Sequence, residues 1–208
     1  MPGPLLASAA PLIDWSWIST NGRAILDALN QHVELTALAI GAGLCISVPV
    51  AILAWNRRAL RTVILAVAGL LYTIPSIALF VLVQPLTGYP VSILTAEVAL
   101  TGYTLLILIR NLLTGLDAIP EEVREAAVAS GYSRQGALWR VYLPLALPSL
   151  FAGLRVATVT VVGLVTITAF IGFGGLGTLI LQGFSDYFYT PIVVGLEHLL
   201  VRWRPERG

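Results

Sequence analysis

Residues 35–55 read LTALAIGAGLCISVPVAILAW, a stretch without a charged side chain that three arginines follow closely. A helix needs about 20 consecutive apolar residues to cross the hydrocarbon core of a bilayer, so this stretch predicts a membrane-spanning helix. The whole chain has the same character, since 57% of its 208 residues are hydrophobic, 11% are charged and its mean hydropathy is +0.87. Soluble domains have roughly 45–50% apolar and 25% charged residues. We therefore predict an all-α integral membrane protein whose residues 1–208 form a single transmembrane domain.

Further apolar stretches predict the other spans of the bundle. Three of them, at residues 62–86, 91–109 and 148–171, are long enough to cross the membrane. Pro75 lies inside the first, and a proline within a helix removes a backbone hydrogen bond, so we expect a kink there. A shorter stretch at residues 190–203 falls well below ~20 residues and either crosses the membrane or only dips into it. The expected bundle thus has about five transmembrane helices.

Basic residues predict the orientation of these helices. Short cytoplasmic loops carry an excess of basic residues. All twelve basic residues are arginines, and only Arg23 falls on the outer side if the N-terminus lies outside and the C-terminus in the cytoplasm. Residues 1–31 then form an extracytoplasmic segment whose tryptophans favour a helix lying in the membrane interface, a soluble flap being the alternative. Residues 111–147 form a long cytoplasmic loop.

This loop is predicted to contain one well-delimited helix of about ten residues. Pro120 suits the first turn, Glu121 and Glu122 favour the positive N-terminal end, and Gly131 follows the last helical residue. Small side chains recur at helical spacing and form one face, which consists of Val123, Ala126, Ala127 and Ser130. Small residues allow another backbone to approach closely, which suggests a binding face. The alternative is an ordinary surface helix packed under its own bundle.

A spaced motif extends from this helix into the rest of the loop. It consists of Glu-Ala-Ala, three residues, Gly, nine residues, an aliphatic residue, one residue and Leu-Pro. Its residues are Glu125, Ala126, Ala127, Gly131, Val141, Leu143 and Pro144. The pattern resembles the loop of inner-membrane permease subunits of ATP-binding-cassette importers, in which isoleucine is commoner at the position of Val141.

Shorter matches extend the resemblance to nearly the whole chain. Tyr-Thr-Ile-Pro-Ser at residues 72–76, Ile-Arg-Asn at 109–111 and the glycine-rich segment at 169–177 are similar to the osmoprotectant branch of these permeases, which carries glycine betaine, choline or carnitine. The resemblance implies a type I importer permease with a MetI-like bundle in the bacterial inner membrane. The chain departs from this branch at its end, where members usually have a longer last helix.

The resemblance also implies partners. They would be ATPase subunits, a second permease that is identical or a sister chain, and an extracytoplasmic substrate-binding protein; no nucleic acid is expected. The chain lacks lysine, which phosphate-loop ATPases use to bind nucleotide, so we expect a transport subunit that is not an enzyme and needs no cofactor.

The helix in the loop would then couple the permease to the ATPase. Ala126, Ala127 and Gly131 would fit a groove on the ATPase, and Glu125 would hold the loop in place through a salt bridge or a cap. The Leu-Pro pair at residues 143–144 would turn the chain back to the membrane.

Five residues within the predicted spans are candidates for the translocation pathway. They are Glu97, Tyr72, Pro75, Tyr103 and Phe170. An acidic residue inside a span is costly and often lines a pathway, and aromatic rings attract quaternary ammonium groups. The alternatives are an acidic side chain that reaches the outer interface and aromatic rings that only pack.

Other signals in the sequence have simpler interpretations. A G-x-G-x-x-G pattern at residues 172–177 follows a predicted span rather than a strand, which favours a tight turn over a dinucleotide site. His32 and His198 have no partners at metal-ligand spacing, so no metal site is predicted. Cys45 is expected to be a small buried core residue. The rival functions are a permease for another small solute, such as an amino acid, and a secondary transporter, although no internal repeat supports the latter.

Overall fold

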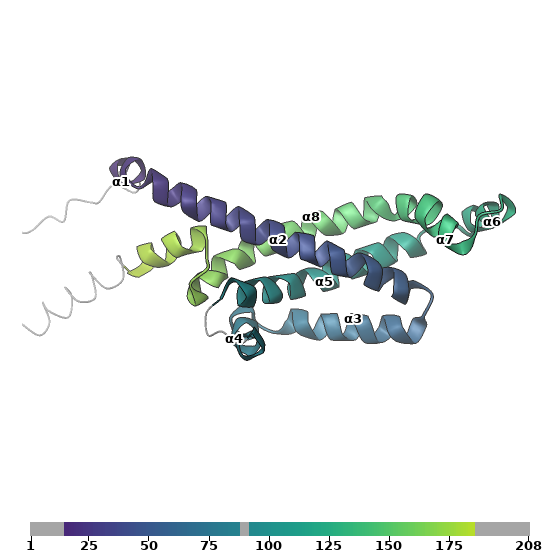
Figure 1. Ribbon diagram of the computed structural model, residues 1–208, viewed down its shortest axis with the longest axis horizontal. Helices are drawn as coiled ribbons and strands as arrows, with labels where there is room; N and C mark the ends of the chain where they lie inside the picture. The colour runs from purple at the N-terminus through teal and green to yellow at the C-terminus, as the bar shows by residue number, and fades with distance from the viewer. Residues whose placement is uncertain (1–14, 88–91, 186–208) are drawn as a thin grey trace, which may run out of the picture.

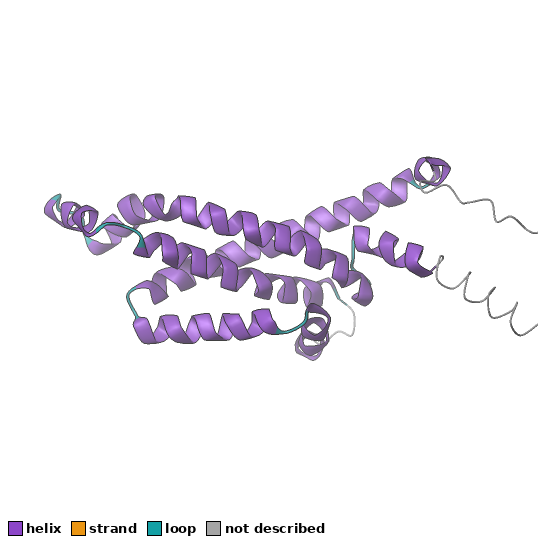
Figure 2. Ribbon diagram, turned by 180° about the vertical axis from the view of Figure 1, so that it is seen from behind, coloured by secondary structure: helices purple, strands orange, loops and turns teal. Residues whose placement is uncertain are grey.

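The computed structural model describes residues 15–87 and 92–185. The described residues are almost entirely helical and contain no strand (Figure 2). In chain order the helices are α1 (Trp15–Thr20), α2 (Gly22–Trp55), α3 (Arg58–Thr73), α4 (Ser76–Thr87), α5 (Ile93–Asp117), α6 (Glu121–Ala129), α7 (Arg134–Ala137), the π-helix η1 (Leu138–Tyr142), α8 (Leu143–Ile167), the 3-10 helix η2 (Thr168–Ile171) and a last helix, Leu176–Ser185. The predicted all-α bundle is confirmed.

Three helices in the described part of the chain are long and apolar enough to cross a membrane. They are α2, α5 and the continuous helix Arg134–Ile171, and the bent pair of α3 and α4 would provide a fourth crossing. Figure 1 shows α6 and α7 at one end of the long axis, with α1 at the other. The predicted span at residues 190–203 lies outside the described residues.

The first membrane helix is longer than its apolar stretch. Helix α2 has 34 residues and is therefore about 51 Å long, compared with roughly 30 Å for the hydrocarbon core. Arg23, Asp27 and Glu34 end the apolar stretch, but they do not end the helix. Residues 22–31 consequently continue α2 and do not form the separate interfacial helix that the sequence suggested.

The predicted kink at Pro75 is a complete break in the helix. Helices α3 and α4 meet there at an angle of 111°, and Figure 1 shows α4 nearly end-on beside α3. Ile74 has the extended conformation expected of a residue before proline, with φ −68° and ψ 128°. The hydroxyl of Tyr103 on α5 donates a hydrogen bond to the Ile74 carbonyl at this break.

Helix α5 lies at the centre of the bundle and contributes to two apolar clusters. The first cluster brings α5 together with α2, α4 and α8, and its members include Leu35, Phe80, Leu100, Tyr103 and Val161. The second cluster lies toward α6, and its members are Ala51, Ala54, Ile109, Leu112, Leu113, Leu116, Ile119 and Ala146. The two clusters fix the helices that carry the loop.

Small residues allow the long helices to approach α5 closely. A Cβ atom added to Gly153 of α8 would lie 2.6 Å from the Asn111 Cβ, and one added to Gly43 of α2 would overlap the Thr104 side chain. Cys45 lies on the other side of α2 and is exposed. The prediction that Cys45 is a buried core residue is therefore wrong, because Gly43, two residues earlier in the helix, faces α5 instead.

Replacing Gly43 by alanine should destabilise the bundle. The added methyl group would displace the buried Thr104 side chain, and overpacking of this kind costs about 1–3 kcal/mol. We expect the thermal unfolding midpoint in detergent to fall by about 2 to 10 °C. Gly41→Ala is the matched control, because a Cβ atom there would have no neighbour within 4 Å in the described part of the chain. Equal destabilisation by the two variants would contradict this packing.

The glycine-rich segment after α8 is the tight turn that the sequence suggested. Gly172 and Gly175 have φ values of 89° and 50°, a region that favours glycine. The Gly175 N–H donates to the Gln31 side-chain oxygen at 2.9 Å, and a Cβ atom on Gly175 would lie 2.7 Å from the His32 Cβ. The turn therefore packs directly against α2, in a helical setting without the strand of a dinucleotide site.

Candidate functional site

The predicted loop helix exists and ends where the sequence indicated. Helix α6 has nine residues, with Pro120 at its N-cap and Glu121 and Glu122 in its first turn. Gly131 follows with φ 78°, and the Tyr132 N–H returns to the Ala127 carbonyl at 3.1 Å. This is the usual way in which glycine ends a helix. Much of the predicted loop at residues 111–147 is nevertheless helical, since α5 runs to Asp117 and the chain is helical again from Arg134.

Helix α6 presents a different face from the one predicted. Ala127 is only 5% exposed, and Val123 packs against the second cluster. The exposed residues at helical spacing form what we call the free face, which consists of Glu122, Glu125, Ala126 and Ala129. The face of small residues was therefore predicted on the wrong side of the helix. Two of its members, Val123 and Ala127, pack α6 against its own bundle. Ala127 cannot fit a groove on a partner, whereas Ala126 and Gly131 remain exposed.

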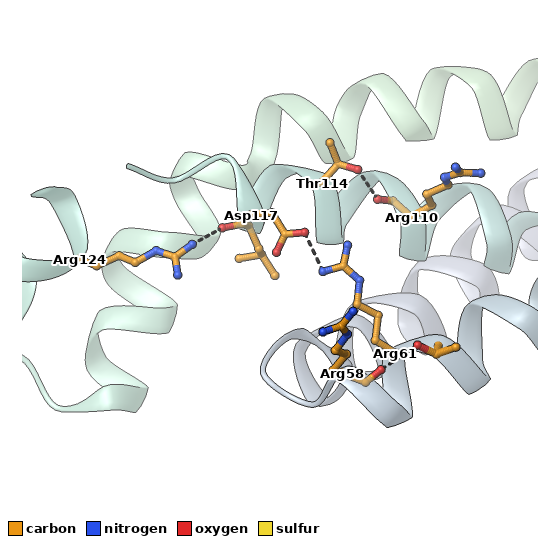
Figure 3. Close-up of polar contacts among 8 residues, drawn as sticks. Arg58, Arg61, Arg110, Thr114, Asp117 and Arg124 are labelled. Atoms are coloured by element: carbon orange, nitrogen blue, oxygen red, sulfur yellow. Dashed lines mark hydrogen bonds and ion pairs between the residues drawn. The ribbon is translucent and has the colours of Figure 1, made fainter. Parts of the chain in front are cut away.

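Arg124 holds α6 to the membrane helices. Its Nη2 donates to the Leu116 carbonyl at the end of α5, at 3.2 Å, as Figure 3 shows. Its guanidinium lies 5.2 Å from the centre of the Trp55 ring at the end of α2. The carboxylate of Glu121 is 3.9 Å from its Nε. The positive charge of Arg124 also interacts favourably with the dipole of α5, because it lies at the C-terminus of that helix.

The Trp55 ring continues this connection to the next segment of the chain. It packs edge-on against Tyr142 of η1, with ring centres 5.6 Å apart. We call Arg124, Trp55 and Tyr142 the Arg124 clamp. Cation–π contacts contribute about 0.5–2 kcal/mol, and hydrogen bonds to charged groups about 1.5–3 kcal/mol. The clamp thus ties α6 to α2, α5 and η1 with contacts that are strong for a surface helix.

Sequence reasoning did not identify the clamp and assigned its role to Glu125. Glu125 is exposed and forms no ion pair within the described residues. A shallow cavity of about 350 Å³ lies beside it, lined by Glu121, Arg124, Glu125, Val128, Ala129 and Tyr142. The Glu125 carboxylate therefore borders an open groove and does not hold the loop. No local signal in the sequence identifies Arg124, because its contact with Trp55 joins residues that are far apart in the chain.

The last part of the motif does not form a turn. Val141 lies in η1, and Leu143 and Pro144 begin α8 within one continuous helix. Pro144 has no N–H to bond the carbonyl four residues earlier, and a π-helical turn precedes it. The predicted turn at residues 143–144 is therefore wrong, and the chain instead reverses near Gly131.

Three of the pathway candidates meet at the break between α3 and α4. Tyr72 and Tyr103 pack edge-on with ring centres 5.8 Å apart, next to Pro75. Tyr103 is 5% exposed, and its hydroxyl is bonded to Ile74, so in this conformation it stabilises the break. Tyr72 is 39% exposed and remains accessible.

The other two candidates lie apart from the tyrosines. Glu97 is half-buried on α5, and one of its carboxylate oxygens has no hydrogen-bond partner among the described residues. The like charge of Glu34 on α2 acts on it. Phe170 on η2 is 59% exposed and has no ring contact with another described aromatic residue. Glu34 could not be recognised as a neighbour of Glu97 from its sequence position, because it lies just outside the apolar stretch.

Comparisons with known proteins agree with this architecture. Residues 43–197 match the family model described as binding-protein-dependent transport system inner membrane component. The chain is 42% identical over 168 residues to the osmoprotectant import permease protein OsmW of Salmonella typhimurium, covering 79% of this chain and 78% of OsmW. It is 29% identical over 180 residues to the glycine betaine/carnitine/choline transport system permease protein OpuCB of Bacillus subtilis, covering 86% and 82% of the two chains.

A solved structure has the same fold. The chain superposes with a TM-score of 0.70 on a chain from the inward-facing MetNI methionine ABC transporter, covering 92% of this chain and 95% of the other. Their sequences are 23% identical. The predicted MetI-like bundle is thereby confirmed.

Proposed function

The chain belongs to the family of binding-protein-dependent transport system inner membrane components, and from this we propose that it is the permease subunit of an ATP-binding-cassette importer for an osmoprotectant. The solute is a small compound such as glycine betaine, choline or carnitine, as the names of its relatives suggest. The main support for a coupling role is the arrangement of helix α6. It presents an exposed face, while Arg124 holds it to the bundle.

We assign the chain to the bacterial inner membrane as a multi-pass protein with its N-terminus outside and its C-terminus in the cytoplasm. This orientation places the arginines around α6 on the cytoplasmic side, as the charge rule requires. The ATPase subunits dock there, a second permease lies alongside, and a binding protein delivers the solute from outside. ATP is hydrolysed on the separate ATPase subunits, and this chain needs no cofactor.

The Arg124 clamp suggests how movement reaches the membrane helices. A partner that binds the free face of α6 and moves would displace this helix. Arg124 connects α6 to the ends of α2 and α5, so these helices would be displaced with it. Closure of the ATPase dimer on ATP would therefore move these helices together and shift the bundle between inward-facing and outward-facing states. A flexible loop could not transmit such a displacement.

For the solute pathway we retain Glu97, Tyr72 and Phe170 as candidate contacts. All three have accessible surface on this chain, and a carboxylate or an aromatic ring attracts a quaternary ammonium group. Pro75 and Tyr103 shape the pathway through the break between α3 and α4. The relatives favour an osmoprotectant over an amino acid, the second candidate, because the likeness to the methionine transporter concerns the fold alone.

Uptake measurements test this function. We expect a bacterial strain without osmoprotectant uptake to accumulate radiolabelled glycine betaine, choline or carnitine when it produces this chain with its ATPase and binding protein. Accumulation should stop when the ATPase is inactivated, because hydrolysis drives the bundle between its two states. Labelled methionine is the control solute. Accumulation of methionine without any of the three osmoprotectants would contradict the proposal.

A further inference from the structure

A basic pocket lies at the hairpin between α2 and α3, next to the Arg124 clamp. This cavity of about 460 Å³ is lined by Trp55, Asn56, Arg58, Arg61, Thr62 and Leu65. Its polar side offers two guanidinium groups and an amide, while Trp55 and Leu65 provide an apolar side. The pocket is therefore suited to an anion that is attached to an apolar group.

The charges around the pocket leave it positive. Asp117 of α5 forms an ion pair with Arg61 at 2.7 Å, which fixes the Arg61 side chain and offsets one charge. Arg58 is exposed and has no ion pair among the described residues, and the neighbouring Arg57 is exposed as well. Figure 3 shows Arg58 and Arg61 next to each other at the start of α3, with Asp117 reaching Arg61. One guanidinium is thus held in place and another is available for an anion.

The position of the pocket relates it to the membrane surface. Trp55 is the last residue of the apolar stretch of α2, and tryptophan is enriched at the level of the lipid headgroups. Farther along α3, Val63, Val67 and Leu70 are exposed apolar residues at helical spacing. A lipid with its phosphate in the pocket would lay an acyl chain along this apolar row.

We propose that this pocket binds the phosphate group of an anionic phospholipid. A guanidinium group can donate two parallel, charge-assisted hydrogen bonds to the oxygens of one phosphate. Basic pockets between transmembrane helices are known to bind acidic headgroups. A zwitterionic headgroup binds less well, because its cationic end is repelled by the same arginines. The bound headgroup contacts Trp55, whose ring also packs against Arg124, so it stabilises the Trp55 ring within the Arg124 clamp.

Native mass spectrometry of the full chain in detergent tests this site. The probes are phosphatidylglycerol and phosphatidylcholine with identical acyl chains. We expect more phosphatidylglycerol than phosphatidylcholine to remain bound, and Arg58→Gln to weaken phosphatidylglycerol binding about tenfold, which corresponds to about 1.4 kcal/mol. Arg110→Gln is the matched control, because Arg110 is exposed, does not line the pocket and loses the same charge.

Three results would overturn the proposal. Equal binding of the two lipids would show that the chain does not recognise the anionic headgroup. Equal losses in the two variants would show attraction to net charge without a site. Binding of millimolar inorganic phosphate that displaces phosphatidylglycerol and depends on Arg58 would make this a free-phosphate site.

Arg58→Gln should leave the unfolding midpoint unchanged, since Arg58 has no ion pair among the described residues. The binding measurement needs neither the solute nor the ATPase, so its outcome is independent of the transport function.

Discussion

Replacing Ala126 by arginine should abolish co-purification of the ATPase subunit while the permease still inserts into the membrane. Ala126 is exposed on the free face of α6, so a longer side chain at this position can extend into solvent. It would, however, hold a closely packed partner away from the helix. We expect recovery of the ATPase with the tagged permease to fall at least tenfold, which corresponds to about 1.4 kcal/mol or more of lost binding free energy.

Ala59→Arg is the control for this experiment. Ala59 is also an exposed alanine in a helix at the same end of the molecule, but it belongs to α3. The control variant should retain the ATPase at the level of the unmodified chain. If Ala126→Arg retained it equally well, the free face of α6 would not be the docking surface.

Replacing Arg124 by leucine should uncouple transport from ATP hydrolysis. Leucine preserves apolar contact with Trp55 but removes the hydrogen bond to the Leu116 carbonyl and the cation–π contact. The free face of α6 remains intact, so the ATPase should still bind and hydrolyse ATP. The displacement of α6 would no longer reach α2 and α5, and we expect solute uptake to fall about tenfold or more, as if the transition barrier rose by about 1.4 kcal/mol.

Two further variants make the uncoupling experiment specific. Arg134→Leu removes an exposed arginine of α7 that forms no ion pair within the described residues, and it should transport normally. Arg124→Lys keeps the charge but loses the planar group that stacks on Trp55, so we expect intermediate uptake. Normal uptake by Arg124→Leu, or loss of ATPase binding in that variant, would contradict a role in transmission.

Local signals in the sequence predicted local structure well. Pro120 and Gly131 delimit α6 because their effects depend only on their own backbone geometry. The long apolar stretches indicated the membrane helices for a similar reason, since the bilayer imposes a minimum apolar length. The ends of α2 and α5 could not be predicted in this way, because a helix can continue beyond the membrane.

Features that depend on distant residues could not be predicted from the sequence. Which side of α6 faces the bundle is set by two contacts, namely the packing of Val123 on the second cluster and the contact of Arg124 with Trp55. Both contacts join residues that are far apart in the chain. A proline signals a possible kink, whereas the 111° break at Pro75 also involves the Tyr103 hydroxyl on another helix. The motif correctly located the loop helix, but it did not reveal which of its residues face inward.

Photo-crosslinking within the assembled transporter tests the docking role of α6 most directly. A benzophenone side chain at Ala129, on the free face, should give an adduct with the ATPase subunit. The same group at Leu70, which is 68% exposed on the apolar row of α3, should give none. An active transporter without an adduct at Ala129, or with equal adducts at both positions, would contradict the account.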